Sequence, residues 1–191
     1  MTIKIFYSII IVKKCVRRLF YRYISENFTN YVNQGELEAG NISFDYIKLL
    51  DEEVEQARED LIQSKGYFIL PSELFCNIHK KAPENENLNE TLELVFRNIE
   101  ASTQKRDSEK NFKGLFDDID VNSNKLGKTV AKRNEKLVKL LNSVGKMKLD
   151  SYQENTIDAF EDAYEYLMGM YTSNVEKSGV LYSTISSNRT K

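Results

Sequence analysis

The chain has few of the residues on which small metal-bound or disulfide-linked proteins depend. Its 191 residues include two cysteines, one histidine, two prolines and no tryptophan. A structural zinc site needs four cysteine or histidine ligands, so this composition excludes one. Two cysteines also provide no disulfide framework, which favours a reducing compartment. The scarcity of proline, with abundant leucine, lysine, asparagine and glutamate, favours helices in one domain or slightly more.

The glycines are scattered, and their spacing excludes the common phosphate-binding loops. The GxGxxG and P-loop patterns place glycines two to five residues apart in a fixed order. No such pattern occurs among the eight glycines, which are Gly35, Gly40, Gly66, Gly114, Gly127, Gly145, Gly169 and Gly179. Nucleotide binding through either loop is therefore excluded.

Residues 118–124 begin as a calcium-binding loop does, with aspartates or asparagines at alternate positions. That loop requires glycine at its sixth position and a bidentate glutamate at its twelfth. The chain has Ser123 and Thr129 there. We therefore predict an acidic turn that precedes a helix, and no metal site.

Three isolated residues also carry no evident chemistry. His79 lies beside two lysines without a nucleophile or carboxylate assigned to it, so we predict a surface or helix-end position. Cys15 and Cys76 lie in amphipathic stretches and are predicted to pack as small hydrophobic side chains.

The N-terminal apolar run is too short to cross a membrane. Residues 5–12 are apolar except for Ser8, and Lys4 and Lys13 bracket them. A bilayer requires roughly 20 apolar residues, and no small-residue cleavage site follows the run. We predict no membrane attachment and a cytoplasmic protein.

Charge alternates along the chain although the total is only −2. Residues 1–24 carry a net charge of +6, residues 25–100 carry −10, residues 101–148 carry +6, and residues 149–191 carry −4. An alternation this coarse indicates separate charged surfaces.

Apolar spacing of three and four residues predicts an all-α protein, a helical bundle of about five to seven helices. The expected helices span residues 16–32, 51–65, 73–80, 89–99, 127–144 and a last stretch from Ser151 or Asn155 through Met168. Gly35 is expected to stop the first, Gly66 to end the second and Ser72 to cap the third. Residues 67–70 are an apolar run without a partner strand, and the polar residues 102–110 are the best linker candidate.

Two helices have well-defined inward faces. In the first, Val16, Leu19, Phe20, Tyr23, Ile24, Phe28, Tyr31 and Val32 share one face. In the stretch 89–99, Leu92, Val95, Phe96 and Ile99 are predicted to point inward.

Five lysines form the one constellation that points to a function. On a helical wheel they fall within about 80° of each other; they are Lys125, Lys128, Lys132, Lys136 and Lys139. The apolar residues Leu126, Val130, Leu137, Leu140, Leu141 and Val144 occupy an adjacent face. Such a lysine stripe would follow the phosphate backbone of DNA. A solvated helix face is the alternative, and the absence of interleaved aromatics argues against single-strand stacking.

Four segments resemble the modification (M) subunit of type I restriction–modification systems. They are LFYRYISEN (residues 19–27), GYFILPSELF (66–75), GLFDDIDVNSNKLG (114–127) and DAFEDAYEYLMG (158–169). The resemblance runs from about residue 19 to residue 179 in the family's order. It implies an adenine-N6 DNA methyltransferase subunit that uses S-adenosylmethionine and assembles with a specificity subunit and a restriction subunit on double-stranded DNA.

The resemblance extends only to the helical N-terminal domain of that family. The family's catalytic Asn-Pro-Pro motif needs adjacent prolines, and this chain has only Pro71 and Pro83. The glycine-rich cofactor loop is absent as well. We therefore assign no catalytic, cofactor-binding or metal-binding residue here, and expect the chain alone to be inactive without the missing methylase core. The expected divisions are an atypical segment at residues 1–18, the helical domain at 19–178 and a non-native or disordered tail at 179–191.

The C-terminal residues suggest an origin for this division. In the family, a stretch like Gly-Glu-Phe-Tyr-Thr-Pro opens the methylase core. The residues Gly179-Val180-Leu181-Tyr182-Ser183-Thr184 permit codons that, shifted by one nucleotide, encode Glu-Phe-Tyr-Thr-Pro. A one-base frameshift is our hypothesis for this region. The alternative function is a stand-alone helical protein–protein interaction module unrelated to methylation.

Overall fold

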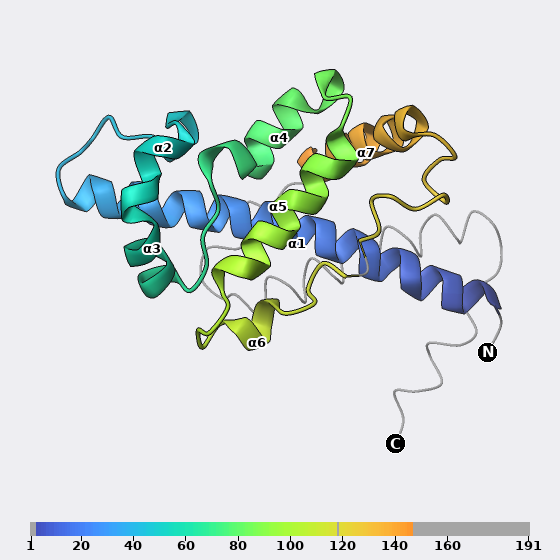
Figure 1. Cartoon of the computed structure of the whole chain (residues 1–191), viewed down its shortest axis with the longest axis horizontal. Coiled ribbons are helices and arrows are strands. Elements are labelled where there is room, and N and C mark those ends of the chain that lie inside the picture. Colours follow the sequence, from blue (N-terminus) through green and yellow to red (C-terminus); the bar gives the residue numbers. More distant parts are fainter. Residues whose placement is uncertain (1–2, 118, 147–191) are drawn as a thin grey trace. The chain divides into compact units, whose positions relative to one another are not determined.

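The computed structural model describes the backbone of residues 3–117 and 119–146, and the side chains from Leu19 onward within those ranges. Figure 1 shows that the described part is built from helices, which confirms the all-α prediction. The α-helices are α1 (Ile3–Glu38), α2 (Asp51–Val54), α3 (Arg58–Lys65), α4 (Phe75–Lys81), α5 (Leu88–Ser102), α6 (Glu109–Phe112) and α7 (Val130–Gly145). Single 3₁₀ turns are η1 (Tyr46–Lys48), η2 (Glu55–Ala57), η3 (Pro71–Glu73) and η4 (Ala82–Glu84).

Residues 17–147 form one compact unit, and residues 1–16 with 148–191 form another. Of the second unit, the structure describes only the helical backbone of residues 3–16. The helix predicted to end at Met168 and the tail predicted at residues 179–191 lie outside the described residues.

The predicted linker at residues 102–110 is wrong, because these residues lie inside one compact unit and are hydrogen-bonded to another part of it. Ser102 and Thr103 are buried. The Ser102 hydroxyl accepts a hydrogen bond from the main-chain N–H of Phe68 at 3.0 Å, and the Ser108 hydroxyl donates to the Gly66 carbonyl at 2.5 Å. A polar stretch is held here by hydrogen bonds to buried main chain, which composition does not reveal.

Helix α1 supplies one wall of the core. Its buried apolar residues are Leu19, Tyr21, Ile24, Phe28 and Val32. Tyr31, which was predicted to face inward, is 39% exposed. Its ring lies at the surface under the ammonium group of Lys65, 4.9 Å from the ring centroid. The helix also passes Gly35 and ends at Glu38, since a single glycine costs a helix only about 1 kcal/mol.

Aromatic rings join α1 to the rest of the core. The Phe28 ring contacts the rings of Tyr46, Tyr67 and Phe68 at centroid distances of 5.5, 5.5 and 5.8 Å. Seven residues earlier in α1, the Tyr21 ring packs edge-on against two more phenylalanines of the core, Phe75 and Phe96, at 5.7 and 5.4 Å. These contacts link α1 to η1, the segment after α3, α4 and α5.

The segment after α3 is extended and buried but forms no strand within the described residues. Gly66 ends α3 in the left-handed conformation (φ +88°), as predicted. Tyr67, Phe68 and Ile69 are then buried. The predicted Ser72 cap is wrong: its hydroxyl donates to Asp51 Oδ2 at 2.6 Å, and α4 begins later, at Phe75.

Helix α5 matches its prediction closely, because Leu92, Val95, Phe96 and Ile99 are all buried. The predicted acidic helix at residues 51–65 is present as α2, η2 and α3 in succession. Within the described ranges, no helix combines the length and the apolar character that crossing a bilayer requires.

Candidate nucleic-acid interface

Helix α7 starts at Val130 because the preceding threonine caps it. Thr129 has extended backbone (φ −120°, ψ 157°), and its side chain accepts a hydrogen bond from the Lys132 N–H at 3.3 Å. The helix was predicted to begin at residue 127 but begins at Val130. Lys125 and Lys128 therefore lie in the turns before it and not on its surface. The helical-wheel stripe therefore holds only for Lys132, Lys136 and Lys139.

The same turn contains Gly127-Lys128-Thr129, the last three residues of a P-loop pattern. Asn122 stands where the first glycine of that pattern is required. A Cβ at Gly127 would lie 2.7 Å from the Lys132 Cβ, so glycine here permits close packing on α7. Thr129 caps α7 and Gly127 packs against it, so this segment serves the start of the helix and is not a phosphate-binding loop.

Apolar residues fix one face of α7. Leu137, Leu141 and Val144 are buried against neighbouring helices, and α7 contacts both α4 and α5. Leu126 and Leu140 are half-buried, whereas Val130 is 40% exposed. The predicted apolar face is thus correct except at Val130, the first residue of α7.

Polar contacts from other elements fix the position of α7 further. The Asn134 carbonyl oxygen accepts the Asn89 N–H at 3.1 Å, and its amide donates to the Glu86 carbonyl. At the other end, Arg22 of α1 donates to the Val144 carbonyl at 2.7 Å and to the Gly145 carbonyl at 3.4 Å. A guanidinium on the last carbonyls satisfies acceptors that the helix itself leaves unpaired.

His79 occupies the helix-end position that was predicted. It lies in the last turn of α4, stacks on Phe75 and pairs its Nε2 with Asn142 Oδ1 of α7 at 2.8 Å. A Cβ at Gly145 would lie 2.8 Å from His79 Cε1, so the histidine ring and α7 are in close contact. His79 is a packing residue that holds α7 against α4.

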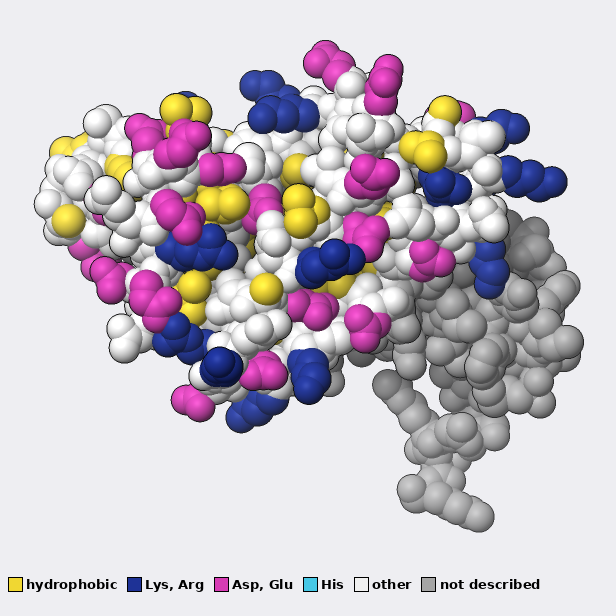
Figure 2. Space-filling model, viewed as in Figure 1, with side chains coloured by type: hydrophobic (Ala, Val, Ile, Leu, Met, Phe, Trp, Pro, Cys, Tyr) yellow, Lys and Arg dark blue, Asp and Glu magenta, His cyan; other side chains and the backbone are white. Residues whose placement is uncertain are grey.

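All five predicted lysines are exposed. Lys136 Nζ donates to the Lys125 carbonyl at 3.4 Å, which places the turn beside the helix surface. Figure 2 shows lysine and arginine side chains over α7 and the turn before it, at the right-hand edge of the described surface. The structure thus brings Lys125 of the turn beside Lys136 of α7.

One carboxylate lies within this lysine group. Lys139 Nζ binds Glu135 Oε1 at 2.6 Å. That hydrogen bond and the charge of Lys139, with those of Lys132 and Lys136, lower the pKa of the Glu135 carboxyl below its usual value. With one carboxylate among five ammonium groups, the lysine group keeps a net positive charge. It lies on and before a helix that contacts from α1, α4 and α5 hold in place. Such a surface attracts phosphate groups in a salt-dependent way.

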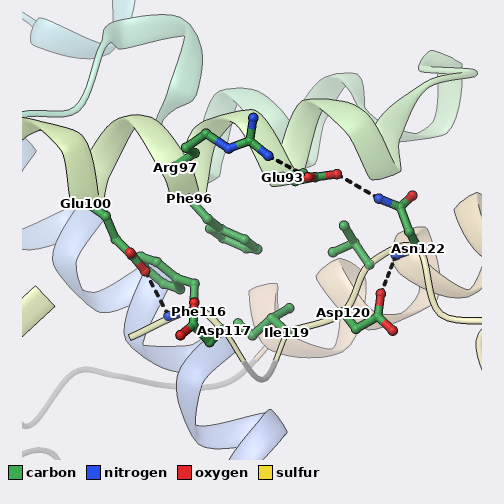
Figure 3. Close-up of a pocket in the computed structure, with 10 residues that line it drawn as sticks. Glu93, Phe96, Arg97, Glu100, Phe116, Asp117, Ile119, Asp120 and Asn122 are labelled. Carbon is green, nitrogen blue, oxygen red and sulfur yellow. Dashed lines mark hydrogen bonds and ion pairs between the residues drawn. The ribbon is translucent and has the colours of Figure 1, made fainter. Parts of the chain in front are cut away.

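An acidic pocket of about 470 Å³ lies between α5 and residues 116–122 (Figure 3). Its carboxylates already serve the fold: Glu100 accepts the N–H groups of Gly114 and Phe116 at 3.3 and 3.1 Å. Asp120 accepts the Asn122 N–H at 3.1 Å. Figure 3 shows the Phe96 and Phe116 rings forming its apolar side, and the two rings stack 4.5 Å apart.

The described residues contain no cluster of three or more metal-ligating side chains. The acidic turn after residue 118 instead packs Ile119 and Val121 into the core, while Asn122 bonds Glu93 at 2.7 Å. Cys76 is exposed on α4, so the prediction that it packs as a small hydrophobic side chain is wrong. The Cys15 side chain lies outside the described residues.

Comparison with known proteins gives consistent results. The HsdM N-terminal domain family matches residues 19–144. The type I restriction enzyme MpnII methylase subunit of Mycoplasma pneumoniae is 47% identical over 168 residues, covering 84% of this chain and 31% of that protein. A crystal structure of a type I restriction-modification system methyltransferase subunit from Streptococcus thermophilus matches with a TM-score of 0.61 and 25% identity, covering 82% of this chain and 32% of that one. The chain therefore spans about a third of the length of these relatives.

Proposed function

This chain belongs to the HsdM N-terminal domain family, and we propose that it contacts the DNA backbone on behalf of a type I modification subunit. The observation that carries this proposal is the group of exposed lysines on α7 and its preceding turn: Lys125, Lys128, Lys132, Lys136 and Lys139. Family membership argues against the alternative of a helical module unrelated to methylation.

The chemistry of this surface favours contact with phosphates and not with base edges. Lysine is a flexible point charge that binds phosphate without reading sequence. Specific base contacts need side chains such as arginine, asparagine or glutamine projected into a groove. We therefore propose that this surface contributes affinity and orientation, and that target recognition belongs to a specificity subunit.

We place methyl transfer outside the described residues. The methylase subunits among the relatives imply S-adenosylmethionine for an intact family member. The acidic pocket beside α5 is a poor match for that cofactor, because Glu100 and Asp120 already accept main-chain N–H groups there. Double-stranded DNA, a specificity subunit, a restriction subunit and a methylase core are the partners we propose.

The test is to replace the three lysines on α7 itself in the full chain. We expect Lys132→Gln/Lys136→Gln/Lys139→Gln to weaken binding to a labelled DNA duplex similarly for unrelated sequences. Each lost phosphate contact should also reduce the slope of log affinity against log salt by about 1. Fluorescence anisotropy at several salt concentrations measures both quantities.

A matched control carries the same change of charge elsewhere. Lys48, Arg97 and Lys113 are exposed on η1, on α5 and just after α6, and none lies on α7, its preceding turn or the end of α4 that packs against α7. The variant Lys48→Gln/Arg97→Gln/Lys113→Gln should bind DNA almost as the parent chain does. Equal losses in the two triple variants would show a general charge effect and contradict the proposal.

A further inference from the structure

A second basic surface lies away from α7, where the end of α3 meets the turn between α5 and α6. A hollow of about 620 Å³ opens there between residues 62–66 and residues 105–111. Four cations line it, and they are Lys65, Lys105, Arg106 and Lys110. Asp107 is the one acidic residue of the lining. Figure 2 shows dark-blue side chains around α6 at the lower edge of the described surface.

The hollow is shaped by contacts between segments about 40 residues apart. The Ser108 hydroxyl binds the Gly66 carbonyl at 2.5 Å, and Arg106 forms an ion pair with Glu59 of α3. The Lys105 N–H donates to Glu109 Oε2 at 2.8 Å. Lys105 itself has a φ of +61°, a left-handed conformation that non-glycine residues adopt infrequently. The surrounding contacts therefore hold the basic turn in one defined shape.

Among the residues that the structure describes, three of the four cations in this hollow have no carboxylate partner, whereas Arg106 is paired with Glu59. Within residues 19–117 and 119–146, the ammonium groups of Lys65, Lys105 and Lys110 make no ion pair with a carboxylate. Lys65 is half-buried over the Tyr31 ring, and this burial lowers the pKa of its ammonium group. Bringing like charges together without a counter-charge is unfavourable, so an anion bound in the hollow relieves the repulsion.

We propose that this hollow binds a phosphate group, and that the phosphate is supplied by the DNA backbone as a contact additional to the α7 lysines. Ammonium groups contributed to one hollow by two segments provide several donors for a multi-oxygen anion. The open shape suits one phosphate of a long ligand running over the surface. The DNA assignment rests on the proposed function, whereas binding of a phosphate group does not.

The first experiment measures DNA binding by Lys65→Gln/Lys110→Gln in the full chain. We expect duplex affinity to fall about tenfold at low salt and the salt slope to decrease by about 2. Lys48→Gln/Lys80→Gln is the control with equal charge, and Lys65→Arg/Lys110→Arg should retain binding. If the arginine variant loses binding as the glutamine variant does, the effect is structural and the proposal fails.

The second experiment titrates the parent chain with inorganic phosphate and follows amide shifts by ¹H–¹⁵N NMR. Saturable shifts at residues 105–111, absent in Lys65→Gln/Lys110→Gln, support the phosphate site. If phosphate binds to the parent chain but Lys65→Gln/Lys110→Gln leaves the DNA affinity unchanged, the DNA assignment is overturned. A small phosphorylated ligand is then the source of the phosphate. Loss of DNA binding only in the α7 variant, without phosphate shifts in the hollow, overturns this inference and leaves the proposed function intact.

Discussion

Three buried tyrosines connect α1 and η1 to the main chain of residues 67–73. The hydroxyls of Tyr21, Tyr46 and Tyr67 donate to the carbonyls of Glu73, Ile69 and Ile24 at 2.5, 2.8 and 3.0 Å. Burial raises the pKa of each phenol above its ordinary value. Each hydroxyl thus remains a neutral donor to a main-chain carbonyl. Tyr21 and Tyr46 reach the carbonyls of Glu73 and Ile69, whereas Tyr67 adds a hydrogen bond to the Ile24 carbonyl within α1.

Glu73 lies at the same place and makes the fold sensitive to pH. It is 8% exposed, and Asn98 Nδ2 donates to its Oε1 at 2.5 Å. Burial raises the pKa of its carboxyl above the usual value. The protonated carboxyl therefore stabilises the fold below the unfolded-state pKa, and this contribution is lost as pH rises through the folded-state pKa.

We expect Glu73→Gln to raise the free energy of unfolding at pH 7–8 and to change it little near pH 4, because glutamine keeps the acceptor for Asn98 without a buried charge. Urea denaturation at several pH values measures this difference. Glu90→Gln, on the exposed side of α5, is the control for the loss of one surface carboxylate. A constant difference between pH 4 and pH 8 would contradict the prediction.

At the scale of elements, two glycines in helices play opposite roles. Gly66 ends α3 at a φ of +88°, and a Cβ there would lie 3.3 Å from the Ser108 Cβ. Gly35 lies within α1, where a Cβ would meet nothing within 4 Å.

We expect Gly66→Ala to lower the free energy of unfolding by about 1–2 kcal/mol, since alanine is strained in the left-handed conformation. Gly35→Ala should raise it by about 0.5–1 kcal/mol through its better helix propensity. Chemical denaturation of both variants provides the comparison. Effects of the same sign would show that the two glycines do not differ in this way.

Elements with local signals were predictable, and those fixed by distant partners were not. The three-four spacing of Leu92, Val95, Phe96 and Ile99 identifies α5 because its buried face is continuous. Lys65-Gly66 identifies the end of α3 for an equally local reason. No comparable local signal marks Ser102, whose role depends on the Phe68 N–H, 34 residues away.

The candidate interface likewise contains residues that local spacing predicts and residues whose placement depends on distant parts of the chain. Lysine spacing predicted the face formed by Lys132, Lys136 and Lys139. Lys125 and Lys128 were placed on the same helical wheel, but a wheel does not detect a cap, and Thr129 caps a helix that begins only at Val130. The hollow was missed because its basic residues come from α3 and from the polar stretch after α5, which is a linker only by composition.

At the scale of the whole described unit, the aromatic contacts of α1 unite segments that are distant in sequence. Phe28 is fully buried and touches rings from η1 and from residues 67–68. We expect Phe28→Ala to lower the free energy of unfolding by about 3–5 kcal/mol. Far-UV circular dichroism and tyrosine fluorescence should report the same shifted midpoint, because one core serves all these elements.

The control for this prediction is Leu94→Ala. Leu94 is 55% exposed on α5, so its loss should change stability by less than about 0.5 kcal/mol. Separate transitions for the two probes in Phe28→Ala would show that α1 and the other helices unfold independently.

The contacts that hold α7 by Arg22, His79 and Asn134 have a kinetic consequence for the function we propose. A rigid helix that presents ammonium groups meets an equivalent phosphate at every base-pair step of a duplex. When the protein moves by one step, counterions leave the DNA phosphates that it newly contacts and bind again to those that it has left. Displacement along the duplex therefore changes the free energy little. A surface of this kind lets an assembly diffuse along DNA while remaining bound, until a sequence-reading partner arrests it.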